Sequence, residues 1–128
     1  MDPGALETLG MVHATQGRFE EALVVTERAY ALMPQSNIIA GQLAALLARA
    51  GAVDRAAELI KKVKYSPLPG VAVGAALYHA LSGEFEEAAQ WTERAIDERY
   101  TLLVAKIGTL FRPRPQWAAL AKLMNLPA

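Results

Sequence analysis

One phrase occurs twice in this chain. Residues 17–29 read GRFEEALVVTERA, and residues 83–95 read GEFEEAAQWTERA. The two phrases are identical at nine of thirteen positions and begin 66 residues apart. A sequence that repeats itself at a fixed spacing indicates stacked copies of one structural unit. This repetition constrains the fold more than any other feature of the chain.

A third, weaker copy lies between the two phrases. GAVDRAAELIKKV at residues 51–63 keeps a leading glycine, an apolar residue two positions later and an alanine five positions later. Gly17, Gly51 and Gly83 are spaced 34 and then 32 residues apart. A period of this length is typical of helical repeats. The sequence therefore predicts three units, at residues 3–36, 37–68 and 69–102.

Each unit has the pattern of two helices joined at its glycine. Apolar residues recur at helical spacing before each glycine, and a second such pattern starts two residues after it. Glycine adopts the left-handed C-cap conformation without strain, so it should end the first helix. Small residues recur where the two helices must approach to about 8 Å. They are Gly10, Ala22, Ala44, Ala56, Ala76 and Ala88, while Phe19, Val53 and Phe85 should pack under the turns.

The residues after the third unit predict a cap. Residues 101–110 have the pattern of a helix, and the RPRP run at 112–115 ends it because proline breaks a helix. Pro115 then opens a last helix that presents Trp117 on its apolar face. A solenoid needs its exposed apolar end covered. We therefore predict an all-α solenoid of three helix-turn-helix repeats plus a two-helix C-terminal cap at residues 103–126.

This arrangement resembles the tetratricopeptide repeat, which implies a right-handed solenoid. The residues that carry the resemblance are Leu6, Leu9, Gly10, His13, Gly17, Phe19, Ala22, Ala29, Pro34, Gly83, Phe85, Ala88 and Ala95. Residues 91–127 also look like the tails that close such arrays in bacterial multidomain regulators. The residues that match those tails are Trp91, Glu93, Ala95, Glu98, Arg99, Leu103, Pro115, Trp117, Leu120, Met124 and Leu126. Since the chain opens almost directly on a helical pattern, we interpret it as a piece of a longer protein.

Composition argues against several functions. Thirteen basic and thirteen acidic residues cancel, so no strong field favours nucleic acid or an anionic membrane. There is no cysteine, and hence neither a disulfide nor a thiolate metal site. The first residues lack the pattern of a signal peptide, and no apolar run reaches the length of about 20 residues that crosses a bilayer. These features predict a cytoplasmic protein.

The residues that could carry catalysis are scattered. His13 and His79 occupy equivalent positions in the first and third units, so they are too far apart to bind one metal ion together. Each should pack with its polar edge at the surface. Glu20 and Glu21 are adjacent, and neighbouring helical residues point about 100° apart. No serine has a histidine in a recognisable nucleophile setting. We therefore predict no enzyme, no catalytic or metal-binding residue and no cofactor.

The resemblance implies a concave groove lined by the first helices of the units. The predicted lining is Glu7, Met11, Thr15, Ile38, Gly41, Ala45, Arg49, Val73, Leu77 and Leu81. Some relatives grip acidic peptide tails with basic residues there, but this lining is small and mostly apolar. It predicts a protein or peptide partner with apolar anchors, or an adjacent domain of the parent chain. The alternative is a homo-oligomerisation or scaffold module, because an exposed apolar face also drives self-association.

Overall fold

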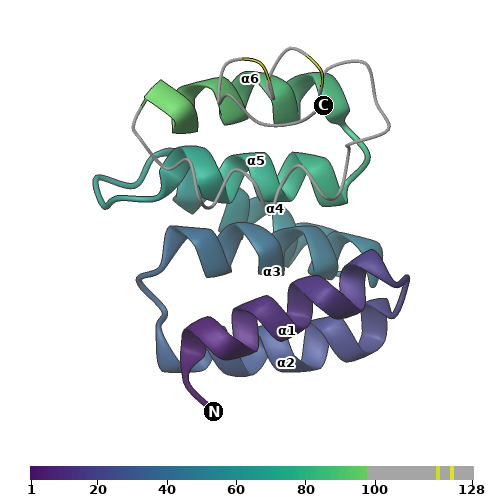
Figure 1. The fold of residues 1–128 in the computed structure, drawn as a ribbon. Helices are drawn as coiled ribbons and strands as arrows, with labels where there is room; N and C mark the ends of the chain where they lie inside the picture. Colours follow the sequence, from purple (N-terminus) through teal and green to yellow (C-terminus); the bar gives the residue numbers. More distant parts are fainter. Residues whose placement is uncertain (98–117, 119–121, 123–128) are drawn as a thin grey trace.

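The computed structural model describes residues 1–97, 118 and 122 of the chain, and residues 3–97 contain six helices. They are α1 (Pro3–Thr15), α2 (Phe19–Leu32), α3 (Asn37–Arg49), α4 (Val53–Lys64), α5 (Val71–Leu81) and α6 (Phe85–Asp97). The all-α prediction is confirmed: the helices pack in the adjacent pairs of a helical repeat (Figure 1). The predicted cap at residues 103–126 lies outside the described residues, apart from the two isolated positions.

The three tight turns share one hydrogen-bond pattern. Gly17, Gly51 and Gly83 have left-handed φ angles of 77°, 90° and 79°. The N–H one residue after each glycine donates to a carbonyl near the end of the preceding helix, at 2.8, 2.9 and 2.8 Å in turn. A glycine at C′ followed by such a bond satisfies orphan carbonyls at a helix end. The predicted role of the glycines as helix stops is therefore confirmed.

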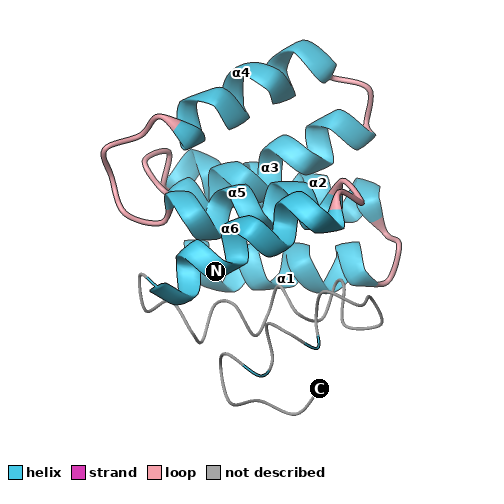
Figure 2. Ribbon diagram, turned by 90° about the horizontal axis from the view of Figure 1, so that it is seen from above, coloured by secondary structure: helices cyan, strands magenta, loops and turns pink. Residues whose placement is uncertain are grey.

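The helices run back and forth, so the connections collect at two ends. The three glycine turns lie at one end of the molecule, which we call the turn end (Figure 1). The longer loops at residues 33–36 and 65–70 lie at the opposite end, which we call the loop end. Both ends are also visible from above (Figure 2). Pro34, Pro67 and Pro69 fall in the loops, which is consistent with the inability of proline to continue a helix.

Small residues let the helices of a pair touch. Ala22, Ala56 and Ala88 are at most 2% exposed. A Cβ on Gly10 would lie 2.8 Å from Gln42 Nε2 and closer still to Thr26 Oγ1. Side-chain packing at these positions therefore follows the prediction.

The expected apolar wedges under the turns are only partly present. Phe19 and Phe85 are half-buried, but Val53 is 61% exposed, so the prediction was wrong for the second unit. Valine is shorter than phenylalanine and does not reach across the turn. No apolar side chain from position 53 therefore packs under the turn at Gly51.

Two glycines inside helices bring α3 and α5 together. A Cβ on Gly41 would lie 2.7 Å from the Cα of Gly74 and closer to its carbonyl group. A Cβ on Gly74 would in turn lie 2.9 Å from the carbonyl carbon of Asn37 and closer to its oxygen. Real Cβ atoms do not approach backbone this closely, so the two helices cross at a point where neither carries a side chain.

Candidate functional site

The predicted groove residues lie on α1, α3 and α5, but most are not on the surface. Thr15 and Arg49 are exposed, and Ile38 is half-buried. The remaining predicted lining residues, Glu7, Met11, Gly41, Ala45, Val73, Leu77 and Leu81, are buried. Gly41 is the contact point with α5 described above. Most of the predicted lining residues therefore do not form an open row of side chains on the surface.

The buried members join hydrophobic clusters. Met11, Val73 and Leu77 belong to one cluster, and the half-buried Ile38 packs against it. Ala45 and Leu81 belong to another, which lies nearer the turn end. Side chains in such clusters support the fold by removing apolar area from water. They are reached by a partner only where a recess opens beside them.

One recess at the turn end is lined by three of the predicted residues. Thr15, Arg49 and Leu81 line a cavity of about 200 Å³, together with Ala14, Phe19, Ala80, Gly83 and Phe85. The three occupy equivalent places, each two residues before the glycine of its turn. Stacked repeats align equivalent positions, and here one comes from each of α1, α3 and α5. The structure thus brings together this part of the predicted groove.

Arg49 is held at the centre of this region. Its guanidinium lies 4.1 Å from the centroid of the Phe19 ring, and its Nε donates to Leu81 O at 2.8 Å. A cation over an aromatic face is stabilised by the ring quadrupole, by about 0.5–1 kcal/mol at an exposed site. The two contacts fix the position of the Arg49 charge. In the sequence, Arg49 is recognisable only as a single basic residue among mostly apolar lining residues.

A larger recess begins on the other side of the Phe19–Arg49 pair. It has a volume of about 730 Å³ and is lined by Gly17, Arg18, Phe19, Glu20, Glu21, Leu23, Leu46, Arg49 and Ala50. Both signs of charge are present, with Arg18 and Arg49 against Glu20 and Glu21. The turn end therefore offers a broad polar and aromatic surface around one fixed arginine. The sequence reasoning missed Phe19 as a contact residue because its repeated position indicated packing alone.

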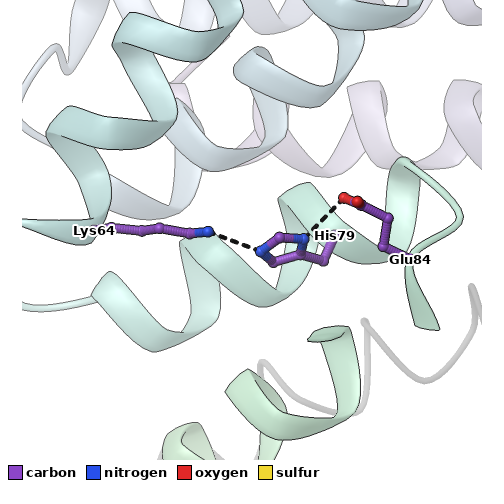
Figure 3. Close-up of polar contacts among 3 residues, drawn as sticks. All are labelled: Lys64, His79 and Glu84. Atoms are coloured by element: carbon purple, nitrogen blue, oxygen red, sulfur yellow. Dashed lines mark hydrogen bonds and ion pairs between the residues drawn. The ribbon is translucent and has the colours of Figure 1, made fainter. Parts of the chain in front are cut away.

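The two histidines, equivalent in sequence, have different surroundings. His79 is 7% exposed, with its Nε2 3.0 Å from Lys64 Nζ and its Nδ1 2.9 Å from Glu84 Oε1 (Figure 3). A lysine ammonium can only donate, so Nε2 accepts and the ring proton lies on Nδ1, where it donates to Glu84. The prediction of a polar edge at the surface was wrong for His79. His13 is half-buried, and its Nδ1 has no hydrogen-bond partner among the described residues.

The Lys64–His79–Glu84 contacts connect elements rather than build a reactive centre. They join the end of α4, the last turn of α5 and the turn before α6 (Figure 3). Trp91 lies beside them, with the Arg94 guanidinium 4.6 Å and Lys64 Nζ 5.8 Å from its ring. Each of these groups already has a structural contact. We therefore regard this cluster as the polar part of the packing between the second and third units.

The described residues contain no group of three or more side chains placed to hold a metal ion. Within the same part of the chain, no helix is both long and apolar enough to cross a membrane. What these residues do offer is a set of recesses bordered by fixed side chains. Such an arrangement can bind a partner.

Comparison with known protein families agrees with the repeat pattern. The tetratricopeptide repeat profile matches residues 3–28 and 69–94. These two segments are therefore similar to the tetratricopeptide repeat. The matches fall on the two full copies, and the weaker copy between them is not matched. No curated protein and no solved structure matches the chain.

The tetratricopeptide repeat is generally a protein–protein interaction module, and the family is typically non-catalytic. Protein partners are therefore implied in general terms. The resemblance of residues 91–127 to the tails of bacterial regulators remains a prediction. Of the residues that carry it, only Trp91, Glu93 and Ala95 lie within the described part of the chain.

Proposed function

We propose that this chain is a non-catalytic interaction module that binds a protein segment with apolar anchors at the turn end of α1, α3 and α5. The observation that carries the proposal is the meeting of Thr15, Arg49 and Leu81 at one recess. Each comes from a different repeat, so a ligand there would contact all three units. A bound segment would seat an apolar side chain beside Phe19 and Phe85.

Arg49 is the residue on which specificity should depend. The face of its guanidinium lies against the Phe19 ring, and its Nε donates to Leu81 O. The two Nη groups are therefore left to donate to an acceptor of the partner. Because the guanidinium is already held in place, little side-chain entropy remains to be lost on binding. A backbone carbonyl or a carboxylate next to the apolar anchor would satisfy it.

The larger context is also a proposal. We propose one domain over residues 1–128, with repeats at 3–36, 37–68 and 69–102 and the cap at 103–126. The resemblance of the tail supports placing it at the C-terminal part of a larger bacterial regulatory protein. In that setting the partner would be a segment of another protein or an adjacent domain of the parent chain.

Photocrosslinking from the turn end tests the proposal. A photoreactive phenylalanine analogue replaces the exposed Thr15, and in a matched control it replaces Val24, which is 62% exposed on α2. Illumination in a lysate of the source cells should give a crosslinked partner from position 15 and not from position 24. Arg49→Ala should lower the yield of that product. Equal products from both positions, or a product with a second copy of the chain alone, would contradict the proposal.

Buried members of the predicted row are unsuitable for this test. Met11 and Leu77 are 5% and 2% exposed. A glutamate at either position would place an unpaired carboxylate in an apolar cluster, at a cost of several kcal/mol, on the order of the whole stability of a small domain. The predicted groove lining places both side chains at the surface, where such changes would leave melting unaltered, and their burial contradicts that expectation.

A further inference from the structure

The loop end carries an unusual share of exposed apolar side chains. Eight large apolar residues of the described chain are exposed: Met1, Val12, Val24, Leu32, Met33, Val53, Tyr65 and Leu68. Four of them lie in the segments 32–33 and 65–68, whereas the three valines are spread over three helices. Single exposed apolar residues are normal, but apolar residues that gather at one recess indicate an interaction surface, and Met33 and Leu68 line the same recess. We call this group and the recesses beside it the loop-end surface.

Two recesses indent the loop-end surface. The first has a volume of about 350 Å³, within the range of roughly 300–1,000 Å³ typical of ligand sites. It is lined by Tyr30, Pro34, Gln35, Asn37, Ala40, Leu59, Lys62, Val63, Ser66 and Leu68. The second has a volume of about 250 Å³ and is lined by Met33, Gln35, Ser36, Asn37, Ile38, Leu68, Pro69 and Gly70. Gln35, Asn37 and Leu68 line both, so the two recesses are neighbours.

The loop that presents Leu68 is fixed by one buried side chain. Asn37 Nδ2 lies 3.0 Å from Ser66 Oγ, 3.2 Å from Leu68 O and 3.0 Å from Pro69 O. Ser66 Oγ also accepts a hydrogen bond from Leu68 N at 3.1 Å. Since prolines 67 and 69 restrict the backbone further, a ligand meets a surface that is already ordered. An ordered surface loses little conformational entropy on binding.

The one charged residue that lines either recess in the described part of the chain is basic. Lys61, Lys62 and Lys64 lie in the last turn of α4, and Lys62 lines the first recess. Neither recess has a carboxylate among its lining residues. Lys64 is engaged by His79, and of the three lysines only the exposed Lys62 lines a recess, where it can meet a ligand. A complementary ligand is apolar where it enters the recesses and acidic beside them.

From these observations we propose that the loop-end surface binds an acidic peptide segment with two apolar anchor residues, one for each recess. Leu68 lies between the anchors, and Lys62 meets the acidic side chains. The site is separate from the turn end, which lies at the other end of the helices (Figure 1). Ile38 is the one predicted groove residue that lines it.

Selection of peptides against the full chain tests this directly. A random peptide library displayed on phage is selected on the immobilised protein and depleted on the Leu68→Glu variant. Synthetic versions of the enriched peptides are then titrated by fluorescence anisotropy. We expect them to carry two apolar residues and a net negative charge, and to lose affinity by at least about tenfold on Leu68→Glu and several-fold on Lys62→Glu. Val24→Glu is the matched control and should change affinity by less than about twofold.

The result is interpretable whatever the selection returns. Circular dichroism of each variant shows whether it keeps its helices, and Leu68→Ser replaces Leu68→Glu if the latter does not. Failure to enrich any peptide, enrichment of uncharged peptides, or equal affinity for the Leu68 and Val24 variants would each overturn the proposal. Light scattering that shows a dimer lost in Leu68→Glu would assign the surface to a second copy instead. The photocrosslinks from position 15 are independent of all these outcomes.

Discussion

The crossing of α3 and α5 allows a sharp test, because a single methyl group should separate the helices. In Gly41→Ala the new Cβ would lie 2.7 Å from the Cα of Gly74 and nearer to its carbonyl group. These are backbone atoms, so no rotamer change relieves the overlap, and α5 must move as a body. The same argument holds in reverse for Gly74→Ala, whose Cβ would meet the backbone of Asn37.

Two effects of opposite sign determine the size of the change. Alanine is favoured over glycine inside a helix by about 1 kcal/mol. Overpacking of a dense site costs about 1–3 kcal/mol, and we expect the upper end or more because backbone meets backbone. The net loss of unfolding free energy should therefore be about 2 kcal/mol or more. At roughly 4 °C per kcal/mol for a chain of this size, Tm should fall by about 8 °C or more.

The assay is thermal unfolding followed by circular dichroism at 222 nm (the standard helix band), with Gly4→Ala as the matched control. Gly4 is exposed in the first turn of α1, and its new Cβ would meet only the Asp2 side chain, at 3.3 Å. That variant should stay within about 0.5 kcal/mol of the wild type. If Gly41→Ala melts in the same range as Gly4→Ala, the helices do not cross where we place them, and the explanation of the buried row fails.

Two further predictions concern the loop end and the third unit. Asn37→Ala should lower the urea unfolding free energy by about 2 kcal/mol, because the hydrogen bonds that hold residues 66–69 are lost; a change under about 0.5 kcal/mol would show that the loop is held by other contacts. Burial, and then the charge of Glu84, raise the pKa of Tyr78 above its usual value near 10. The unfolded chain therefore loses this proton first, so stability should fall as pH rises past about 10. Urea midpoints between about pH 9 and 11 should fall less in Tyr78→Phe, and parallel curves for the two proteins would refute this assignment.

The parts of the fold that could be predicted from sequence are those that depend only on residues within one unit. A glycine turn needs only local backbone conformation, so Gly17, Gly51 and Gly83 could be placed without knowing what packs against them. The same holds for Ala22 and Ala88, which meet the partner helix of their own unit. Where a unit departs from the repeated residue, as at Val53, the prediction failed with it.

Contacts between units were not predictable, because they depend on how far apart the first helices lie. Gly41 has Glu7 and Val73 at the equivalent positions, so nothing in the repeat indicates a crossing point there. The predicted groove lining assumes that α3 and α5 are separated. Because Gly41 and Gly74 carry no side chains, the two helices make contact instead. The environment of His79 has the same origin, since Lys64 reaches it from the preceding unit.

The positions that the copies do not share carry what distinguishes this chain from another array of the same repeat. The place two residues before each turn glycine holds Thr15, then Arg49, then Leu81, and the structure joins the three at one recess. At the other end, the loop after α4 has an exposed Tyr65 and Leu68 beside the lysines of the last turn. Thr15, Arg49, Tyr65 and Leu68 are exposed, so these positions could vary without loss of the fold, whereas Leu81 is buried. This freedom is the physical reason to look for specificity at the two ends of the helices, where the repeated residues impose least.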